Sequence, residues 1–394
     1  MSQTPIITCI ELIAFEIQLP NLASDPSGLS LHYHPGPGLP QLRFGVRIIT
    51  DSGLVGEYIP PRGRAKVIMA ACEALAYGLI GKPALAREQH YLSMRRATKH
   101  IGEVGIGPLD IALWDLAGKY QNVSISQLLG GNRSRLPTYA STLHGDSEKG
   151  GLSSPEAYAD YAEQCLELGY PAYKVHGWSD GNVVRESAVL RTVAQRVGGK
   201  MALMYDASCY MRSLADAIAV GRVCDEYGYY WYEDPYADGG ISMHGHRKLK
   251  EFVKTPLLIG EHIRNPETMT DMLLQGASDF CRVDPDYDGG ITGSYKAAIA
   301  AEALGMDVEV HSCGPAMRQL MAALTRSNYY ELNLVHPRTG NAWNLPVYGA
   351  GYSDELEAID ADGCVPVPDG PGLGVSYDWA AVERQQVAKR VISR

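Results

Sequence analysis

The sequence lacks the features that mark several large classes of protein. It has no uninterrupted apolar run near the ~18 residues that would suggest a membrane span, and its apolar stretch Val67 to Leu79 is broken by Glu73. It also has no basic cluster, and 45 Asp and Glu outnumber 35 Lys and Arg, for a net charge of −10. These absences disfavour binding to nucleic acid or to a membrane. We expect a soluble protein that acts on a small molecule.

Neither a secretory leader nor a paired cysteine motif is visible in the sequence. The first residues, MSQTPIITCIELIAFEI, contain no basic stretch followed by an apolar core, so we expect a cytoplasmic protein. No CxxC pair occurs, which favours reduced, buried thiols over disulfides or a zinc knuckle. The eight cysteines are Cys9, Cys72, Cys165, Cys209, Cys224, Cys281, Cys313 and Cys364.

The first third of the chain predicts a small α+β unit. Residues 6–18 and 42–50 are rich in β-branched and apolar residues, and Asp51-Ser52-Gly53 predicts a hairpin turn after the second run. Helical spacing of apolar residues follows, at residues 62–79, 85–97 and 105–120. Between the two strands lie about twenty residues without periodicity. A loop of this length is usually functional or disordered, and a lid is one candidate role.

From Leu136 onward, short apolar runs alternate with amphipathic stretches, as in repeated βα units. The runs are LPTYAST, PAYKVH, MALMYD, YYWYED, PLLIGE, DFCRVD, MDVEVH and YYELN. Eight such runs predict an α/β fold with a (β/α)8-type barrel. We therefore expect an N-terminal α+β capping domain over 1–132, the barrel over 133–358, and a C-terminal segment over 359–394 that returns to the capping domain.

Seven of the eight runs end with ionisable residues, and in a barrel all those ends meet at one mouth, where active sites of this fold lie. One ionisable residue at a strand end is equally well explained as a solvated charge at a strand-to-loop junction. Ionisable residues at the ends of seven strands favour a functional site. The residues are Lys174 and His176, then Asp206, Glu233, Glu261, Asp284, His311 and Glu331.

Three of these acids predict a metal site. Asp206, Glu233 and Glu261 lie 27 and 28 residues apart, close to one βα repeat each, so they would face one another from adjacent strands. Three converging carboxylates repel one another unless a cation compensates them, and all-oxygen ligation favours Mg²⁺. We expect one Mg²⁺ per active site. The alternative is an acidic surface patch.

The remaining residues at the mouth are candidate acids and bases. Asp284 and His311, 27 residues apart, predict a dyad in which the carboxylate fixes the imidazole tautomer. Lys174 and His176 alternate along one strand, so both side chains point the same way. Glu331 is a candidate hydrogen-bond donor to a substrate oxygen, if it is protonated or paired with a cation. The alternatives are a His bonded to a backbone carbonyl, a Lys that extends to solvent with a packed His beside it, and a solvated Glu.

This set of residues suits abstraction of a proton α to a carboxylate. A Mg²⁺ that binds the carboxylate oxygens stabilises the dianion formed when the neighbouring carbon loses its proton. A Lys or a His would take that proton.

Two longer motifs and these positions together resemble the enolase superfamily, in particular its mandelate racemase subgroup. GIGPLDIALWDLAGKYQNVSISQLLGG at 105–131 is similar to the family's capping-domain junction, and DGPGLGV at 369–375 is similar to its returning C-terminal segment. The resemblance implies that Asp206, Glu233 and Glu261 are metal ligands. It also implies an Asp284–His311 dyad and, in YYELN, a Glu331 that hydrogen-bonds the substrate carboxylate.

One departure from the family pattern concerns the second base. The usual Lys-x-Lys is Lys174-Val175-His176 here, so His176 either replaces the second lysine, binds a hydroxyl or leaves the role to Lys174. We therefore expect dehydration of a sugar acid to a 2-keto-3-deoxy acid. Alternatives are a racemase, epimerase or cycloisomerase acting through the same enolate, and a non-catalytic metal-binding barrel. The resemblance also implies a homo-oligomer.

Six loop residues around the mouth are candidates for contacts with substrate hydroxyls or a second carboxylate, although each is equally well a surface-loop residue. They are His32, His34, Arg62 (or its neighbour Arg64), His144, His262 and Asp286. His262 directly follows a predicted ligand, so it would point away from the mouth unless its strand has already ended.

Overall fold

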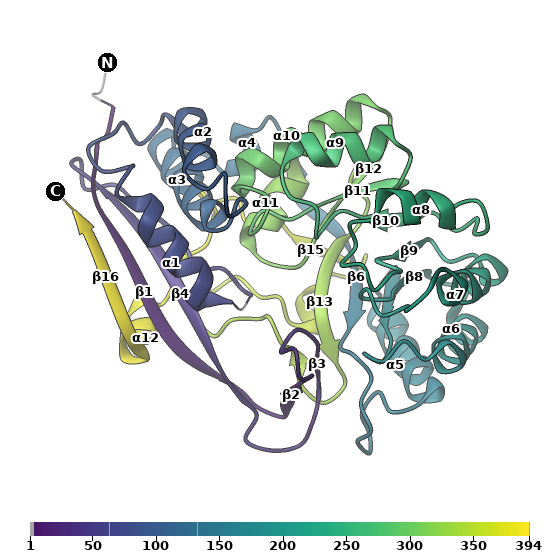
Figure 1. Cartoon of the computed structure of the whole chain (residues 1–394). Helices are drawn as coiled ribbons and strands as arrows, with labels where there is room; N and C mark the ends of the chain where they lie inside the picture. Colours follow the sequence, from purple (N-terminus) through teal and green to yellow (C-terminus); the bar gives the residue numbers. More distant parts are fainter. Residues whose placement is uncertain (1–3, 63, 132, 394) are drawn as a thin grey trace.

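The computed structural model describes residues 4–62, 64–131 and 133–393. An antiparallel sheet covered by helices lies beside a larger barrel of strands and helices (Figure 1). The boundary expected after residue 132 falls on a residue outside those described. None of the helices in the described ranges is long and apolar enough to cross a membrane.

The N-terminal unit is a four-stranded antiparallel sheet in the order β16-β1-β4-β5, with helices packed on one face (Figure 1). Its strands are β1 (Ile7–Leu19), β4 (Leu39–Thr50), β5 (Val55–Tyr58) and β16 (Gln386–Ser393). Its helices are α1 (Ala65–Ala76), α2 (Arg87–Ala97), α3 (Ile106–Gln121) and α4 (Ile125–Leu128). The predicted strands, hairpin turn and three helices are present, with ends shifted by a few residues.

Helix α3 is buried on every side from Ile106 to Gly118, because the sheet covers one face and α10 of the barrel covers another. Gly107 permits a close approach on the barrel side, since a Cβ there would lie 2.3 Å from the Asp286 carbonyl oxygen. A helix that is apolar all round is typical of this sandwiched position. The close contact brings the N-terminal unit against the loop that follows β11.

The long loop after β1 contains a small two-stranded hairpin, β2 (Leu22–Ser24) and β3 (Leu31–Tyr33). It reaches the barrel, where the Leu31 carbonyl accepts a hydrogen bond from the His144 N–H (3.3 Å). Ser30 Oγ and Tyr210 Oη also lie 2.9 Å apart. The loop therefore covers one side of the barrel mouth, as expected of a lid.

Eight parallel strands form the barrel, in the ladder order β12-β11-β10-β9-β8-β7-β6-β13. The strands are β6 (Arg135–Thr142), β7 (Ala172–His176), β8 (Ala202–Asp206), β9 (Trp231–Glu233), β10 (Leu257–Ile259), β11 (Phe280–Val283), β12 (Asp307–Val310) and β13 (Tyr330–His336). Each of the eight predicted runs contains one strand. Among the described residues no ladder joins β12 to β13, and the ring closes there by packing contacts.

Seven helices separate the strands: α5 (Pro155–Leu168), α6 (Val183–Val197), α7 (Leu214–Tyr227), α8 (Met243–Leu249), α9 (Pro266–Leu274), α10 (Gly290–Ala303) and α11 (Pro315–Ala323). The first five begin at a Ser or Asn whose side chain accepts a backbone hydrogen bond, and such a cap stabilises a helix by ~1 kcal/mol. After β13 the chain instead forms a short hairpin with β14 (Gly340–Asn341).

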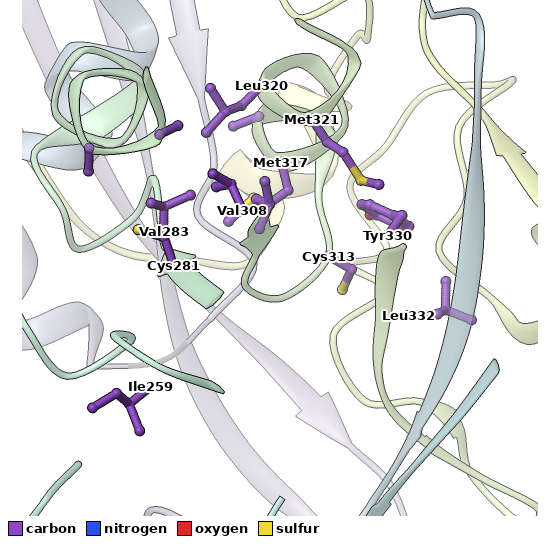
Figure 2. Close-up of a cluster of buried hydrophobic side chains, with 14 of the residues drawn as sticks. Ile259, Cys281, Val283, Val308, Cys313, Met317, Leu320, Met321, Tyr330 and Leu332 are labelled. Carbon is purple, nitrogen blue, oxygen red and sulfur yellow. The ribbon is translucent and has the colours of Figure 1, made fainter. Parts of the chain in front are cut away.

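Alternation along the barrel strands separates an apolar outer face from an inner face that carries the charged residues above a small apolar cluster. Cys281 and Val283 of β11 lie in one buried cluster with Val308 of β12 and with Met317 and Leu320 of α11 (Figure 2). Arg282, which lies between Cys281 and Val283, and Asp284, which follows Val283, are also buried but form ion pairs. Each apolar side chain buried in this layer contributes ~1.5–3 kcal/mol, which holds the charged inner residues in place.

The C-terminal segment serves both units. A short 3-10 turn (Leu356–Ala358) leads to β15 (Cys364–Pro366), which pairs antiparallel with the start of β6 in the barrel. The chain then crosses α3, where Leu373 N–H donates to Asp115 Oδ1 (2.9 Å). It ends with α12 (Trp379–Arg384) and with β16, which pairs with β1. The return to the sheet was expected, whereas the pairing with β6 was not.

Candidate active site

A cavity of about 510 Å³ lies where the barrel mouth meets the N-terminal unit, within the size range of small-molecule sites. Strand ends of the barrel form its floor, and the lid loop and the start of α1 form the opposite wall. The lining includes Leu31, Arg62, Lys66, His144, His176, Asp206, Glu261, His262, His311, Asn333 and Trp343.

The three predicted metal ligands stand on neighbouring strands at this floor. Asp206 and Glu233 are register partners of β8 and β9, and Glu261 comes two residues after the end of β10. Asp206 and Glu233 are buried, and Glu261 is partly buried. In the described part of the chain these carboxylates do not gather within 4.8 Å of one another, because each faces a cationic or imidazole group of its own.

Lys174 lies among the acids. Its Nζ is 3.2 Å from Asp206 Oδ2, 2.8 Å from Glu233 Oε2 and 2.9 Å from Glu331 Oε1, and its side chain is 1% exposed. Burial alone would lower the pKa of Lys174, but Glu233 and Glu331 hold it well above its usual range. Lys174 is therefore an ammonium group that compensates the acids in this state.

The donor set fits a hard divalent cation. All three groups offer carboxylate oxygens, the ligands that Mg²⁺ prefers. Glu233 Oε1 and Glu261 Oε2 are buried and accept no hydrogen bond of good geometry, although Arg282 Nε and His311 Nε2 each lie 3.0 Å away. A buried oxygen without a hydrogen bond is costly unless a charge faces it. These residues could therefore hold Mg²⁺.

His176 approaches the acids from β7. Its Nδ1 lies 2.7 Å from the Thr142 carbonyl oxygen, which only accepts, so Nδ1 carries the proton. Its Nε2 then faces the cavity floor, 2.9 Å from Asp206 Oδ2. The ring of His144 lies 5.1 Å away between centroids. Burial and the nearby His176 lower the pKa of His144 to about 3, so His144 is neutral.

His311 approaches from the other side of the barrel. Its Nδ1 lies 2.7 Å from Asp284 Oδ2 and its Nε2 lies 3.0 Å from Glu261 Oε2. Arg62 reaches the same pair from the N-terminal unit: its Nη2 donates to Asp284 Oδ2, and its Nη1 is 3.0 Å from His311 Nδ1. Burial would raise the pKa of Asp284, but Arg62 and His311 hold it well below its usual range.

Glu331 is an ionised carboxylate in this state. Its oxygens lie 2.9 Å from Lys174 Nζ and 2.8 Å from Arg282 Nη2, and its Oε2 accepts from the Ser312 N–H at 2.6 Å. Burial would raise the pKa of Glu331, but Lys174 and Arg282 hold it well below its usual range. Glu331 thus has no proton to donate, although the expected pairing with a cation is present.

The loop residues proposed for substrate contacts divide into two groups. Arg62, His144 and His262 line the cavity, and His262 reaches it because β10 has ended at Ile259. The other three are corrections. His34 is largely exposed and lies 3.1 Å from Glu148. His32 and Asp286 are absent from the lining; Asp286 instead accepts a 2.6 Å hydrogen bond from Tyr58 behind Arg62.

Sequence reasoning missed Arg282. This residue is fully buried in β11, with its guanidinium between Glu233 Oε1 (3.0 Å) and Glu331 Oε2 (2.8 Å). The signal was available, because an arginine inside a buried run is rare and Arg282 stands two residues before Asp284, on the same face of the strand.

Comparison with known families agrees with this geometry. The family described as enolase C-terminal domain-like matches residues 157–381. The N-terminal domain of the mandelate racemase and muconate lactonizing enzymes matches residues 42–130. The chain belongs to the enolase superfamily, in its mandelate racemase subgroup.

Several relatives within this superfamily act on sugar acids or their lactones. A D-galactarolactone cycloisomerase from Agrobacterium fabrum is 29% identical over 86% of this chain and 89% of its own. A D-gluconate dehydratase from Thermoproteus tenax is 25% identical over 86% and 69%. The crystal structure of a D-glucarate dehydratase from Agrobacterium tumefaciens, complexed with magnesium, superposes with a TM-score of 0.85 at 28% identity and covers 98% of this chain and 100% of its own.

Proposed function

We propose that this enolase superfamily enzyme is a Mg²⁺-dependent sugar-acid dehydratase that forms a 2-keto-3-deoxy acid. The observation that carries the proposal is the placement of His176 and His311. Both line one cavity, with His176 at the end of β7 and His311 directly after β12. These two strands are three apart one way around the barrel and five the other. A substrate held at the carboxylates would lie between two imidazoles.

Asp206, Glu233 and Glu261 would hold the Mg²⁺ and, through it, the carboxylate of the substrate. When bound, the ion supplies a Lewis acid that stabilises the negative charge of the enolate. Lys174 and Arg282 already supply positive charge at the same floor, which suits a site that collects anionic groups. A cation bound to the three carboxylates would neutralise part of the negative charge that Lys174 neutralises in this state.

The two histidines have different partners, and this suggests different roles. His176 donates from Nδ1 to a neutral carbonyl, and its Nε2 faces Asp206 Oδ2 at 2.9 Å. With a cation on Asp206, Nε2 would be free to accept the α-proton of the substrate. His311 has the Asp284 carboxylate on Nδ1, an anionic partner for an imidazolium that donates from Nε2. As the bond between the β-carbon and its hydroxyl breaks, this proton joins the leaving hydroxyl and water departs.

A screen of sugar acids with Mg²⁺ tests the proposal. Semicarbazide would detect 2-keto products by absorbance, and mass spectrometry should show the loss of one water from the substrate. We expect at least one sugar acid to be turned over and the activity to disappear on chelation. A library without turnover, combined with α-proton exchange in D₂O and inverted configuration, would replace the proposal with a racemase or epimerase.

The cycloisomerase relative supports a second candidate, isomerisation of a sugar lactone. The same enolate could expel a β-oxygen that remains attached to the molecule, in which case no water is lost. The product of a lactone substrate would then have the mass of the substrate. This measurement separates the two candidates without any variant.

A further inference from the structure

A mixed cluster of ligand-type side chains lies beside the proposed Mg²⁺ site and takes no part in the proposed reaction. Cys209 follows β8, Asp234 follows β9 and His262 follows β10. One ligand atom from each of the three lies within 4.8 Å of the other two. Among the described residues, no other three His, Cys, Asp or Glu side chains bring their ligand atoms this close together.

Backbone contacts hold the three residues together. The Cys209 N–H donates to the Asp234 carbonyl at 2.7 Å, and the Ala207 N–H donates to the Glu233 carbonyl at 3.0 Å. His262 Nε2 lies 3.0 Å from Asp234 Oδ2. Tetrahedral zinc with Zn–S and Zn–N bonds of about 2.3 and 2.0 Å places neighbouring ligand atoms roughly 3–4 Å apart. The cluster therefore needs only a small adjustment to surround an ion.

The Asp234 carboxylate carries an independent sign of a missing partner. The residue is 1% exposed, and its Oδ1 atom accepts no hydrogen bond. Gly240 closes over the cluster, since a Cβ there would lie 2.9 Å from Asp234 Oδ1 and 2.8 Å from His262 Cδ2. Water has little room on that side. A buried carboxylate oxygen in this position is costly without a hydrogen bond or a cation.

We propose that Cys209, Asp234 and His262 form a second metal site, which takes a borderline transition-metal dication such as Zn²⁺. Thiolate, imidazole and carboxylate together select Zn²⁺ or Co²⁺, whereas Mg²⁺ prefers oxygen alone. On binding, two protons leave to solvent, one from the Cys209 thiol and one from His262 Nε2, which faces the Asp234 carboxylate as a donor. The fourth position is open to water or to Glu261 Oε1, which lies 3.3 Å from His262 Nε2.

Metal content tests this site directly. Purified protein would be equilibrated with limiting Zn²⁺ in excess Mg²⁺, and bound zinc would be counted by mass spectrometry. We expect one Zn²⁺ per chain that Mg²⁺ does not displace. Cys209→Ser and His262→Asn should each weaken Zn²⁺ binding by at least about tenfold. Cys9→Ser, which changes another partly exposed thiol in the distant sheet, should bind as the parent does.

Cobalt provides a second measurement that identifies the sulfur ligand. With Co²⁺ in place of Zn²⁺, we expect a thiolate-to-cobalt charge-transfer band in the near ultraviolet that is lost in Cys209→Ser. Circular dichroism would verify that each variant is folded. The proposal would be overturned if Cys209→Ser bound Zn²⁺ as tightly as the parent, if the band were absent, or if Mg²⁺ displaced the zinc. The cluster would then be a His262–Asp234 ion pair beside a packing thiol.

Discussion

Arg282 is the buried cation that joins two of the acids at the floor of the site. We expect Arg282→Met to lower the free energy of unfolding by about 3–5 kcal/mol, because it leaves Glu233 and Glu331 buried with less compensation. Urea denaturation would measure the change. Arg282→Lys keeps the positive charge but not the two-pronged set of donors, so it should lower the free energy of unfolding by less than Arg282→Met does. Unchanged stability of the Met variant would mean that Lys174 alone compensates both acids.

Isotope exchange should distinguish the proposed roles of His176 and His311. In D₂O, His311→Asn should continue to exchange the α-proton of the substrate, because the variant keeps His176 as the base. Product formation should fall by about 10²–10⁴-fold, because the variant lacks the group that protonates the leaving hydroxyl. His176→Asn should lose both exchange and product. Nuclear magnetic resonance of recovered substrate would record the exchange. The reverse pattern would exchange the two proposed roles.

At the scale of residues, the sequence predicted which positions meet and that Asp284 pairs with His311, but not how the other residues are paired. Spacing of one βα repeat placed Asp206, Glu233 and Glu261 on neighbouring strand ends, because the barrel imposes that register. Pairing depends on side-chain directions that spacing does not contain. Thus Glu331 was a possible proton donor in the sequence, but in the structure it is ionised between Lys174 and Arg282.

Arg62 connects two elements of different units, the segment before α1 and the dyad on β11 and β12. We expect Arg62→Lys to lower kcat by roughly ten- to a hundredfold, since a lysine cannot contact Asp284 and His311 as a fork. Mg²⁺ affinity, measured by thermal shift, should stay constant. Arg96→Lys, at an exposed residue of α2 outside the cavity, is the control. Equal kcat in both variants would show that the dyad does not depend on this contact.

Asp110 joins α3 to α10. It is fully buried, with hydrogen bonds from the Thr292 N–H (2.9 Å) and Oγ1 (2.7 Å). Burial raises the pKa of Asp110 to about 7, above the 3.8 of a free side chain. The folded state thus binds this proton more tightly than the unfolded state, so its contribution to stability is full below about pH 4 and is lost as the pH rises through about 7.

Asp110→Asn should remove that pH dependence. Between pH 4 and 7, the free energy of unfolding of the parent should fall relative to that of the variant by up to a few kcal/mol. Chemical denaturation at several pH values would measure both proteins. Parallel pH profiles would contradict the prediction, and would mean that Asp110 titrates alike in the folded and unfolded states.

At the scale of elements, periodicity predicted the strands and helices that repeat, and missed those that depend on distant partners. The small strand β15 pairs with β6 more than 200 residues earlier, and no local pattern in Cys364–Pro366 specifies that partner. The hairpin β2–β3 lies in a loop rich in Gly and Pro, where its contacts with Tyr210 and His144 support it.

At the scale of the whole molecule, Mg²⁺ should stabilise the fold. An ion present at a hundred times its dissociation constant adds about 2.7 kcal/mol to the free energy of unfolding, if it binds only the folded state. We expect the melting temperature to rise by a few degrees when Mg²⁺ is added and to return to its original value when a chelator removes the ion. Asp206→Asn should abolish the shift. A shift that survives in this variant would place the ion elsewhere.

The last strand of the chain lies beside the first, with Cys9 opposite Ser393. During synthesis, therefore, the outer edge of β1 has no partner until Gln386–Ser393 has left the ribosome, while all eight barrel strands are already complete. An unpaired edge invites pairing with other chains. The nascent protein is thus exposed to misassembly at its N-terminal sheet until β16 is made, and termination before β16 would leave that edge open permanently.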